Sequence, residues 1–506
     1  MNRSKKLVLN TATSLLYQVI GIVCGFILPR IFLETYGSAV NGAVSSITQF
    51  LGFISLCECG VGAVVQSALY KPLAEGDADA YSRIYRSSER FFRKIAWILV
   101  GYTAVLMAVY PLIVGGEFDY FFTFFLVFVI AISSFAQYYF GMTYRLFLSA
   151  DQLGFIQLSL QSGIIILNTV LSIVMMKCGA SVHLVKLMTS LLFTVQPIVY
   201  TIAARRRYRI NRRIVLTEEP LKQKWNGLSQ HIATVILGNA DTVVLTVFST
   251  LENVSVYAVY HLVVNGVKQI VVSLTSGIQA MLGNMYAKKE TETLKTTFSV
   301  FEWGLHTVVT LVFTMTGLLI LPFVRVYTAG IDDAEYIVPV FAILITAAQA
   351  SYCLRLPYNV MVLAAGHYKE TQWSAIIEAA INVVLSVVLV LRFGLVGVAV
   401  GTLAAMLYRT VYLAWYLKKA ILYRPLWLFL KHLLVDALTV CIAVVPYLLL
   451  PRLFALSAVS YGAWIVLALQ TAVLCILAAL LPNLLFYFRE LRLCVATVKR
   501  RFMKRA

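Results

Sequence analysis

The chain alternates long apolar runs with short polar connectors from one end to the other. An α-helix rises about 1.5 Å per residue, so about 20 apolar residues cross the roughly 30 Å hydrocarbon core of a bilayer. We therefore expect an all-α integral membrane protein of about fourteen transmembrane helices, and an even number of spans places both termini on one side. The predicted spans are residues 11–33, 40–67, 92–114, 119–144, 153–176, 183–204, 226–250, 254–285, 298–323, 336–364, 371–392, 395–417, 427–450 and 459–488.

Several residues within these spans recur at positions 214 residues further along the chain. The segment from Asn168 to Ser172 matches that from Asn382 to Ser386, and Tyr144 matches Tyr358 at the same offset. Because six spans return the chain to its starting side, two such halves share one orientation and are related by an axis along the membrane normal. Chance similarity among apolar helices is the alternative. We expect a six-helix lobe at 1–214, a second at 215–425, and two C-terminal helices with a basic tail at 426–506.

Composition leaves little room for a soluble domain. The 506 residues are 60% hydrophobic and 13% charged, with a mean hydropathy of +0.83, whereas soluble chains carry about 25% charged residues. The eight cysteines are scattered through apolar runs, which predicts packing residues. The connectors hold no Walker-type glycine loop, no GxSxG and no clustered carboxylates. We expect no enzyme activity, no cofactor and no metal site, so an ion gradient or the gradient of the substrate itself would supply the energy.

The net charge of +19 is distributed unevenly along the chain. Basic residues gather on alternate connectors, with six at 71–94, eight at 205–224 and seven in the tail from Arg489 to Arg505. Cytoplasmic connectors of membrane proteins are enriched in Lys and Arg, so both termini are predicted to be cytoplasmic. The basic residues then contact anionic head groups of membrane lipids, and nucleic acid is not expected as a partner.

Polar side chains recur at helical spacing in the first two spans of each half. Gln18 lies in span one, Gln49 in span two, and Asn265 and Gln269 in span eight. Polar side chains within a membrane face other helices or a water-filled cavity, because lipid offers them no hydrogen bonds. We predict that these four residues line a substrate path.

Six ionisable residues lie at depth within apolar sequence, where each costs about 2.5 to 3.5 kcal/mol. Lys268, Arg355 and Arg409 are predicted to bind an anionic group, since guanidinium groups suit phosphate. The acids would accept the proton or cation that drives transport; they are Asp241, Glu378 and Glu58. Internal ion pairing, for example of Asp241 with Lys268, is the alternative. The histidines in or beside spans are interpreted as packing residues rather than proton relays; they are His231, His261 and His306.

Several short motifs add a resemblance to this picture. They are Tyr36-Gly37-Ser38-Ala39-Val40-Asn41-Gly42, Gly52-Phe53-Ile54-Ser55-Leu56, Gly60-Val61-Gly62, and Gly238-Asn239-Ala240-Asp241 leading to Tyr257. With the duplicated plan, the chain from about 5 to 488 resembles the polysaccharide transporter branch of the multidrug, oligosaccharidyl-lipid and polysaccharide exporter superfamily. The resemblance implies two six-helix lobes around a central cavity that opens alternately to each side. Basic residues at depth occur only in the second half of the chain. This differs from an arrangement in which both lobes bind the phosphates of the substrate.

The resemblance implies a flippase for undecaprenyl-diphosphate-linked oligosaccharide in the bacterial cytoplasmic membrane, serving surface polysaccharide biosynthesis. Membrane lipids and other polysaccharide assembly proteins would be its partners. The alternatives are a cation-coupled multidrug exporter of the same superfamily, a membrane glycosyltransferase or polymer ligase, and a scaffold for a synthase complex. The deep cations disfavour an exporter of cationic drugs, and the absence of clustered carboxylates in the connectors disfavours the enzyme.

Overall fold

The computed structural model describes residues 3–58, 60–211, 214, 228–275, 277–450 and 460–492. Parts of the predicted basic linker and tail lie outside the described residues, as do Cys59 and Ser276. Among the described residues, every extended element of secondary structure is a helix. Its helices are α1 (Arg3–Gly52), η1 (Phe53–Glu58), α2 (Val61–Glu75), α3 (Ala78–Ile113), α4 (Tyr120–Ala136), η2 (Gln137–Gly141), α5 (Met142–Ala150), α6 (Gly154–Lys177), α7 (Val182–Arg207), α8 (Leu228–Phe248), α9 (Leu251–Leu274), α10 (Ile278–Ala287), α11 (Thr291–Tyr327), α12 (Pro339–Leu354), α13 (Leu356–Ala364), α14 (Gln372–Ala420), α15 (Trp427–Leu449) and α16 (Tyr461–Phe486).

Twelve helical runs in the described residues are long and apolar enough to cross a membrane. Two of these runs, α1 and α14, each consist of two helical segments joined at a kink. The backbone is non-helical at Gly37 (φ 81°) in α1 and at Gly394 (φ 53°) in α14. A positive φ is accessible to glycine, which has no Cβ to clash with the backbone. Counted as separate segments, the runs agree with about fourteen predicted spans. The chain is a multi-pass membrane protein of the all-α class.

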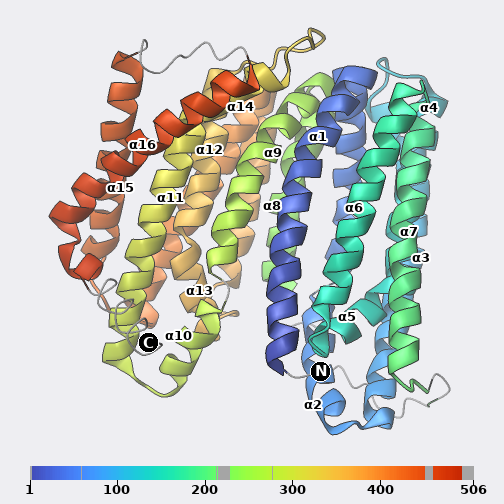
Figure 1. Cartoon of the computed structure of the whole chain (residues 1–506), viewed down its shortest axis with the longest axis horizontal. Helices are drawn as coiled ribbons and strands as arrows, with labels where there is room; N and C mark the ends of the chain where they lie inside the picture. Colours follow the sequence, from blue (N-terminus) through green and yellow to red (C-terminus); the bar gives the residue numbers. More distant parts are fainter. Residues whose placement is uncertain are drawn as a thin grey trace. The chain divides into compact units, whose positions relative to one another are not determined.

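Contacts divide the chain into two compact units, Met1–Ser255 and Val256–Ala506. The helices of each unit are labelled in Figure 1. The first unit takes in α8 and the first turn of α9, through hydrogen bonds such as Thr246 Oγ1 to Ser46 Oγ (2.7 Å) and Asn41 Nδ2 to Ser255 Oγ (2.8 Å). This contact boundary differs from the repeat boundary at 214. The lobes at 1–214 and 215–425 and the appendage at 426–506 therefore stay a prediction.

The helix order repeats along the chain as the duplication predicts. α3 and α11 have 36 and 37 residues, and α5 and α13 have nine each. A glycine with positive φ precedes both α2 and α10, namely Gly60 (71°) and Gly277 (84°). The matched tyrosines, Tyr144 and Tyr358, are each the third residue of their short helix. Similar helix lengths and a positive-φ glycine at matching places agree with an internal repeat, which stays a prediction.

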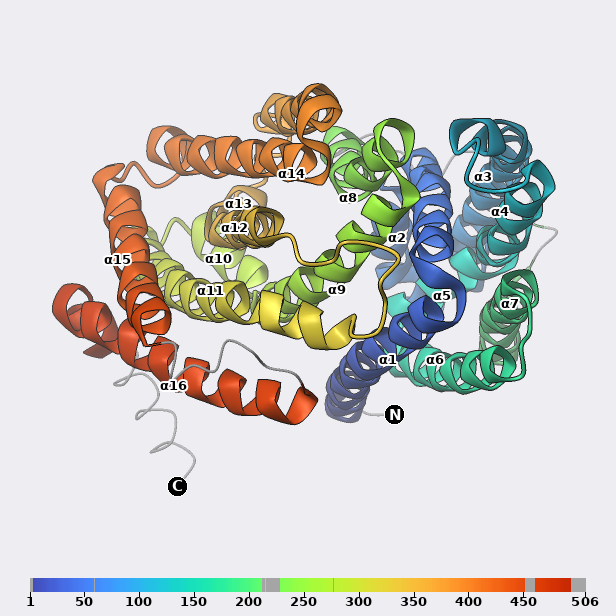
Figure 2. The ribbon, with the colours of Figure 1, turned by 90° about the horizontal axis from the view of Figure 1, so that it is seen from above.

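The two halves of α14 fold back on each other after Gly394. Asn382 Nδ2 donates to Thr402 Oγ1 across this hairpin at 3.0 Å. A Cβ at Gly401 would lie 2.7 Å from the backbone nitrogen of Ser386, closer than real Cβ atoms come. Glycine is thus required for the close packing of the halves. Viewed from above (Figure 2), α12 lies within the second unit beside α14 and α11.

Candidate functional site

Two arginines and a glutamate from the predicted set meet inside the second unit. Arg355 donates from Nη1 to Glu378 Oε1 in an ion pair, and Arg409 Nε lies 3.8 Å from Oε2 of the same carboxylate. All three side chains are buried, with at most 8% of any residue exposed. Arg409 Nη1 also donates to the backbone carbonyl of Thr371 (3.0 Å) and to Ser374 Oγ. Two cations therefore share one carboxylate.

Local breaks in the helices place these charges together. Pro357 has no backbone N–H, so the helical hydrogen-bond ladder is interrupted where α12 ends and α13 begins. Arg355 stands at this junction. Glu378 and Arg409 lie on opposite arms of the α14 hairpin, which brings residues 31 positions apart in sequence to within ion-pairing distance.

Lys268 joins the cluster through an aromatic ring. Its ammonium lies 4.8 Å from the centroid of the Tyr352 ring, and the Arg355 guanidinium lies 4.4 Å from the same centroid. Among the described residues, no carboxylate lies within salt-bridge distance of Lys268. The negative face of an aromatic ring attracts cations and partly offsets their loss of water. We call these four residues, Lys268, Arg355, Arg409 and Glu378, the Lys268 cluster. It contains three basic side chains and one acidic side chain.

The predicted polar residues are distributed over both units. Asn265 and Gln269 lie on α9 of the second unit, on the helix that carries Lys268; Asn265 is half-buried and Gln269 is exposed. Gln18 and Gln49 lie on the two segments of α1 in the first unit, and both are half-buried. Their contribution to a substrate path stays a prediction.

Two of the predicted coupling acids lie in the first unit. Asp241 on α8 is 4% exposed. Glu58 ends η1 and accepts a hydrogen bond from Tyr138 Oη at 2.5 Å. The third acid, Glu378, is the carboxylate between the two arginines. A coupling role for the three acids stays a prediction. Lys268 has no carboxylate partner among the described residues, so the alternative pairing with Asp241 is not observed.

A second buried cluster in the second unit was not predicted from the sequence. Glu302 on α11 is fully buried and pairs through both carboxylate oxygens with Arg424, in the connector after α14. His432 Nε2 on α15 lies 3.3 Å from Glu302 Oε2, and its Nδ1 lies 2.7 Å from Tyr487 Oη.

The same cluster continues to His306 on α11. Its Nδ1 lies 2.7 Å from Asp436 Oδ2 and its Nε2 lies 3.0 Å from Tyr358 Oη. Thr310 donates to the other Asp436 oxygen at 2.8 Å. The available sequence signal was spacing: Glu302 and His306 lie four residues apart, as do His432 and Asp436, so each pair shares one helix face.

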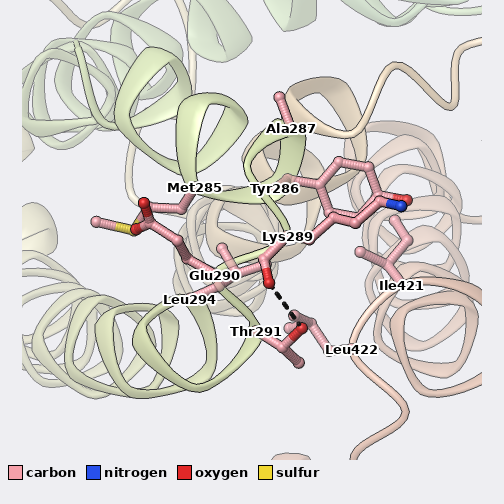
Figure 3. Close-up of a pocket in the computed structure, with 9 residues that line it drawn as sticks. All are labelled: Met285, Tyr286, Ala287, Lys289, Glu290, Thr291, Leu294, Ile421 and Leu422. Carbon is pink, nitrogen blue, oxygen red and sulfur yellow. Dashed lines mark hydrogen bonds between the residues drawn. The ribbon is translucent and has the colours of Figure 1, made fainter.

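Among the hollows of the second unit, one is lined in part by a member of this second cluster. An apolar groove of about 740 Å³ runs between α11, α12 and α15, with Asp436 and Arg325 among its lining residues. A smaller pocket of about 450 Å³, shown in Figure 3, lies between the turn from α10 to α11 and the end of α14. Lys289 and Glu290 line this second pocket, and none of the predicted site residues does.

Outside the spans, Asp151 ties the start of α1 to the turn between α5 and α6. Lys6 Nζ donates to its Oδ1 and to its backbone carbonyl, both at 2.7 Å, while Tyr208 Oη and Arg207 Nε donate to Oδ2 at 2.7 and 3.1 Å. Burial alone would raise the pKa of Asp151, but the hydrogen bonds from Lys6, Tyr208 and Arg207 outweigh it and lower the pKa below its ordinary value. This charged clasp lies entirely in the first unit.

Comparison with solved structures identifies the fold. The lipid II flippase MurJ, in an inward closed conformation, matches with a TM-score of 0.70 and 16% sequence identity over 96% of this chain and 99% of that chain. An inward-facing multidrug resistance transporter of the MATE family, in the MOP superfamily, has a TM-score of 0.52 and 14% identity over 82% of this chain and 99% of its own. The Vibrio cholerae MATE transporter VcmN in its bent form has a TM-score of 0.50 and 14% identity, over 83% of this chain and 98% of that chain.

No protein-family profile matches the chain, and no curated protein matches it in sequence. At such low identities, the structural likeness shows a shared fold. The chain therefore has the all-α fold of membrane flippases and exporters, and its structural neighbours are transporters rather than enzymes.

Proposed function

We propose that this protein is a flippase that moves polyprenyl-diphosphate-linked oligosaccharide across the bacterial cytoplasmic membrane for surface polysaccharide biosynthesis. The observation that carries the proposal is the excess of positive charge around Tyr352. Lys268 and Arg355 contact its ring, Arg409 lies beside Glu378, and a single carboxylate offsets the three cations. An anionic ligand is the natural partner of a buried cationic excess, because it supplies the missing counter-charge.

Within this mechanism the four groups take different parts. Glu378 holds the two arginines in place, so their guanidinium groups need little reorganisation when an anion arrives. Lys268 has no carboxylate within salt-bridge distance among the described residues, so its ammonium is the group best placed to pair directly with a diphosphate. Alternating access of two lobes would then carry the head group across while the polyprenyl chain stays in the bilayer. Both termini are cytoplasmic in this proposal, and partner assembly proteins consume the flipped product.

A cation-coupled multidrug exporter is the second candidate. The fold of the MATE transporters and the buried Asp241 favour it, since an exporter of organic cations needs acidic groups at depth. The Lys268 cluster argues for the flippase, because its positive excess repels a cationic drug.

Reconstituted vesicles distinguish the two candidates. Vesicles containing a fluorescent polyprenyl-diphosphate oligosaccharide are tested for sugar accessible to an impermeant lectin, and parallel vesicles are tested for uptake of a fluorescent organic cation under a proton or sodium gradient. We expect lipid-linked sugar to move, and Lys268→Gln to slow it about tenfold or more through loss of a charge-assisted interaction of about 1.5 to 3 kcal/mol. Lys268→Arg keeps the charge and is expected to retain transport.

Lys71→Gln is the matched control, since it removes a lysine whose side chain is 82% exposed on α2. Transport of the organic cation without any movement of the lipid-linked sugar would replace the flippase with the exporter. Sugar translocation at the wild-type rate in Lys268→Gln would remove Lys268 from the mechanism.

A further inference from the structure

Helices α9 and α12 of the second unit are joined by two contacts that share one register. The ring of Tyr257 on α9 lies 6.0 Å from that of Phe341 on α12, and the Lys268 ammonium lies 4.8 Å from the Tyr352 ring. Eleven residues separate Tyr257 from Lys268, and eleven also separate Phe341 from Tyr352. The two helices therefore run in the same direction, side by side, over about three turns.

Between these two contacts, α9 carries two polar side chains. His261 and Asn265 follow Tyr257 at intervals of four residues, so they lie with Tyr257 and Lys268 within an arc of about 80° around the helix. The His261 ring stacks on the Tyr257 ring, with centroids 5.4 Å apart and planes 15° from parallel. His261 and Asn265 are half-buried, and within the described residues neither side chain makes a hydrogen bond.

The matching face of α12 carries a polar side chain as well. Gln349 lies eight residues after Phe341, as Asn265 lies eight after Tyr257, so the shared register places these two amides at one level. Gln349 is 4% exposed, and its Oε1 is buried without a hydrogen-bond donor in the described part of the chain. Most buried polar side-chain atoms have a hydrogen-bond partner. An unfilled acceptor at this level therefore calls for a polar ligand.

The lack of protein partners separates His261 from a histidine that only fills space. His306, in the same unit, has a hydrogen-bond partner at each ring nitrogen. His261, Asn265 and Gln349 together offer several donors and acceptors that no described residue uses. Lipid chains cannot satisfy them, whereas a ligand that carries many hydroxyl or amide groups can.

The distance of these groups from Lys268 fits the chemistry of a glycosylated diphosphate. Asn265 lies three residues from Lys268, or about 4.5 Å along the helix axis, and His261 lies seven residues away, or about 10 Å. In a lipid-linked oligosaccharide the first sugar is bonded directly to the diphosphate. A diphosphate paired with Lys268 therefore places the first sugar beside Asn265 and Gln349, and the next sugar beside His261.

We propose that His261, Asn265 and Gln349 form a subsite for the first sugars of the substrate, next to the diphosphate. This inference rests on the proposed function, because a diphosphate at Lys268 fixes where the sugars lie. The two amides exchange hydrogen bonds with hydroxyl or acetamido groups of the first sugar, and the His261 ring, held by its stack on Tyr257, bonds the next. The three residues determine specificity for the head group and contribute nothing to binding of the diphosphate itself.

Titration calorimetry of the full-length protein in detergent tests the subsite with short-chain lipids. The probes are farnesyl diphosphates that carry a hexose or an N-acetylhexosamine, and the reference is the methyl ester of farnesyl diphosphate, which has the same charge and no sugar. We expect at least one glycosylated probe to bind the wild type about tenfold more tightly than the methyl ester. His261→Phe, which keeps a ring on Tyr257, and Asn265→Leu are each expected to reduce this preference about fivefold without changing the affinity for the methyl ester. Lys268→Gln is expected to weaken both ligands equally.

His367→Phe is the matched control, because His367 lies in the same unit and its ring already contacts the Tyr416 hydroxyl at 2.9 Å. It is expected to leave both affinities unchanged. A wild type that binds the methyl ester as tightly as every glycosylated probe overturns the subsite and leaves the diphosphate site at Lys268 intact. Equal weakening of both ligands in folded His261→Phe or Asn265→Leu overturns it too, and either variant decides if the other does not fold. A wild type that binds neither ligand contradicts the proposed function, and the subsite with it.

Discussion

At the scale of single residues, the buried charges of the second unit are organised around carboxylates. Glu378 lies between Arg355 and Arg409, and Glu302 lies between Arg424 and His432. Removing water from a charge costs several kcal/mol, and the attraction within such a group repays that cost only while every partner is present. The stability of each cluster therefore depends more on its glutamate than on any one of its basic residues.

Replacing Glu378 by Gln tests this dependence. Gln keeps the size of the side chain but leaves two buried guanidinium groups without a counter-charge, so we expect a loss of about 3 to 5 kcal/mol in the free energy of unfolding. Thermal unfolding of the purified protein in detergent measures it. Lys268→Gln removes a cation that is outside any ion pair among the described residues and is expected to have a much smaller effect. Equal melting temperatures for Glu378→Gln and the wild type would contradict this account.

The residue patterns in the sequence predicted one cluster better than the other. Lys268, Arg355, Glu378 and Arg409 each stand out as a lone charge within an apolar run, and the structure brings them together. Their mutual pairing could not be predicted, because it requires the α14 hairpin. Glu302, together with Asp436, was missed, although four-residue spacing to a histidine marks both. Pairs of titratable residues on one helix face are thus a better signal than isolated charges.

At the scale of elements, glycines and prolines decide where the long apolar helices turn. Gly394 reverses α14, and a Cβ at Gly397 would lie 2.3 Å from the Leu389 carbonyl oxygen. Asn382 and Ser386, the first and last residues of the duplicated motif, lie on the packed face of this hairpin. The sequence therefore predicted the two spans on either side of Gly394, while their tight contact follows from residues without a side chain. The spacing of hydrophobic residues in the sequence does not predict how closely the two arms of α14 approach each other.

The clasp between α1 and Asp151 makes stability depend on pH. Its donors lower the folded pKa of Asp151 below the unfolded value of about 3.9, so the clasp contributes fully above that value. The contribution is lost as the pH falls through the folded pKa, because the protonated acid no longer pairs with Lys6 and Arg207. We expect acidification from pH 6 to 3 to destabilise the wild type by about 1 kcal/mol more than Asp151→Asn. Melting temperatures across that range measure the difference.

Asp332→Asn is the control for the clasp, since Asp332 is exposed in the connector after α11. Its acid response is expected to follow that of the wild type. A wild-type acid response that Asp151→Asn leaves unchanged would show that the clasp does not contribute to stability.

At the scale of the whole molecule, hydrophobic patterning predicted the fold class and the succession of spans. The number of spans could be estimated because each apolar run is long enough to be recognised, and the matched motifs predicted a repeat. The contact boundary at Ser255 could not be predicted, because it depends on tertiary hydrogen bonds such as that from Thr246 to Ser46. A repeat is a property of the sequence, whereas a compact unit is a property of side-chain contacts, so the two boundaries need not coincide.

The orientation of the molecule in the membrane is a prediction from the charge of the connectors alone, and it is open to a direct test. Cys178 is a free, exposed cysteine just after α6, in a connector predicted to lie outside the cell because its flanking connectors are strongly basic. An impermeant maleimide is expected to label it in intact spheroplasts, and Cys178→Ser to abolish that labelling. Cys441 is also exposed, but it lies within α15, where lipid excludes the reagent.

A cysteine on the opposite side completes the topology test. Glu292 has a side chain that is 89% exposed at the start of α11, in a connector predicted to be cytoplasmic. In a Cys178→Ser background, Glu292→Cys is expected to react only after the cells are lysed, because the reagent does not cross the membrane. Labelling of Glu292→Cys in intact spheroplasts, with Cys178 reactive only after lysis, would invert the topology. The Lys- and Arg-rich connectors would then face outward, and the proposed direction of flipping would have to be reversed.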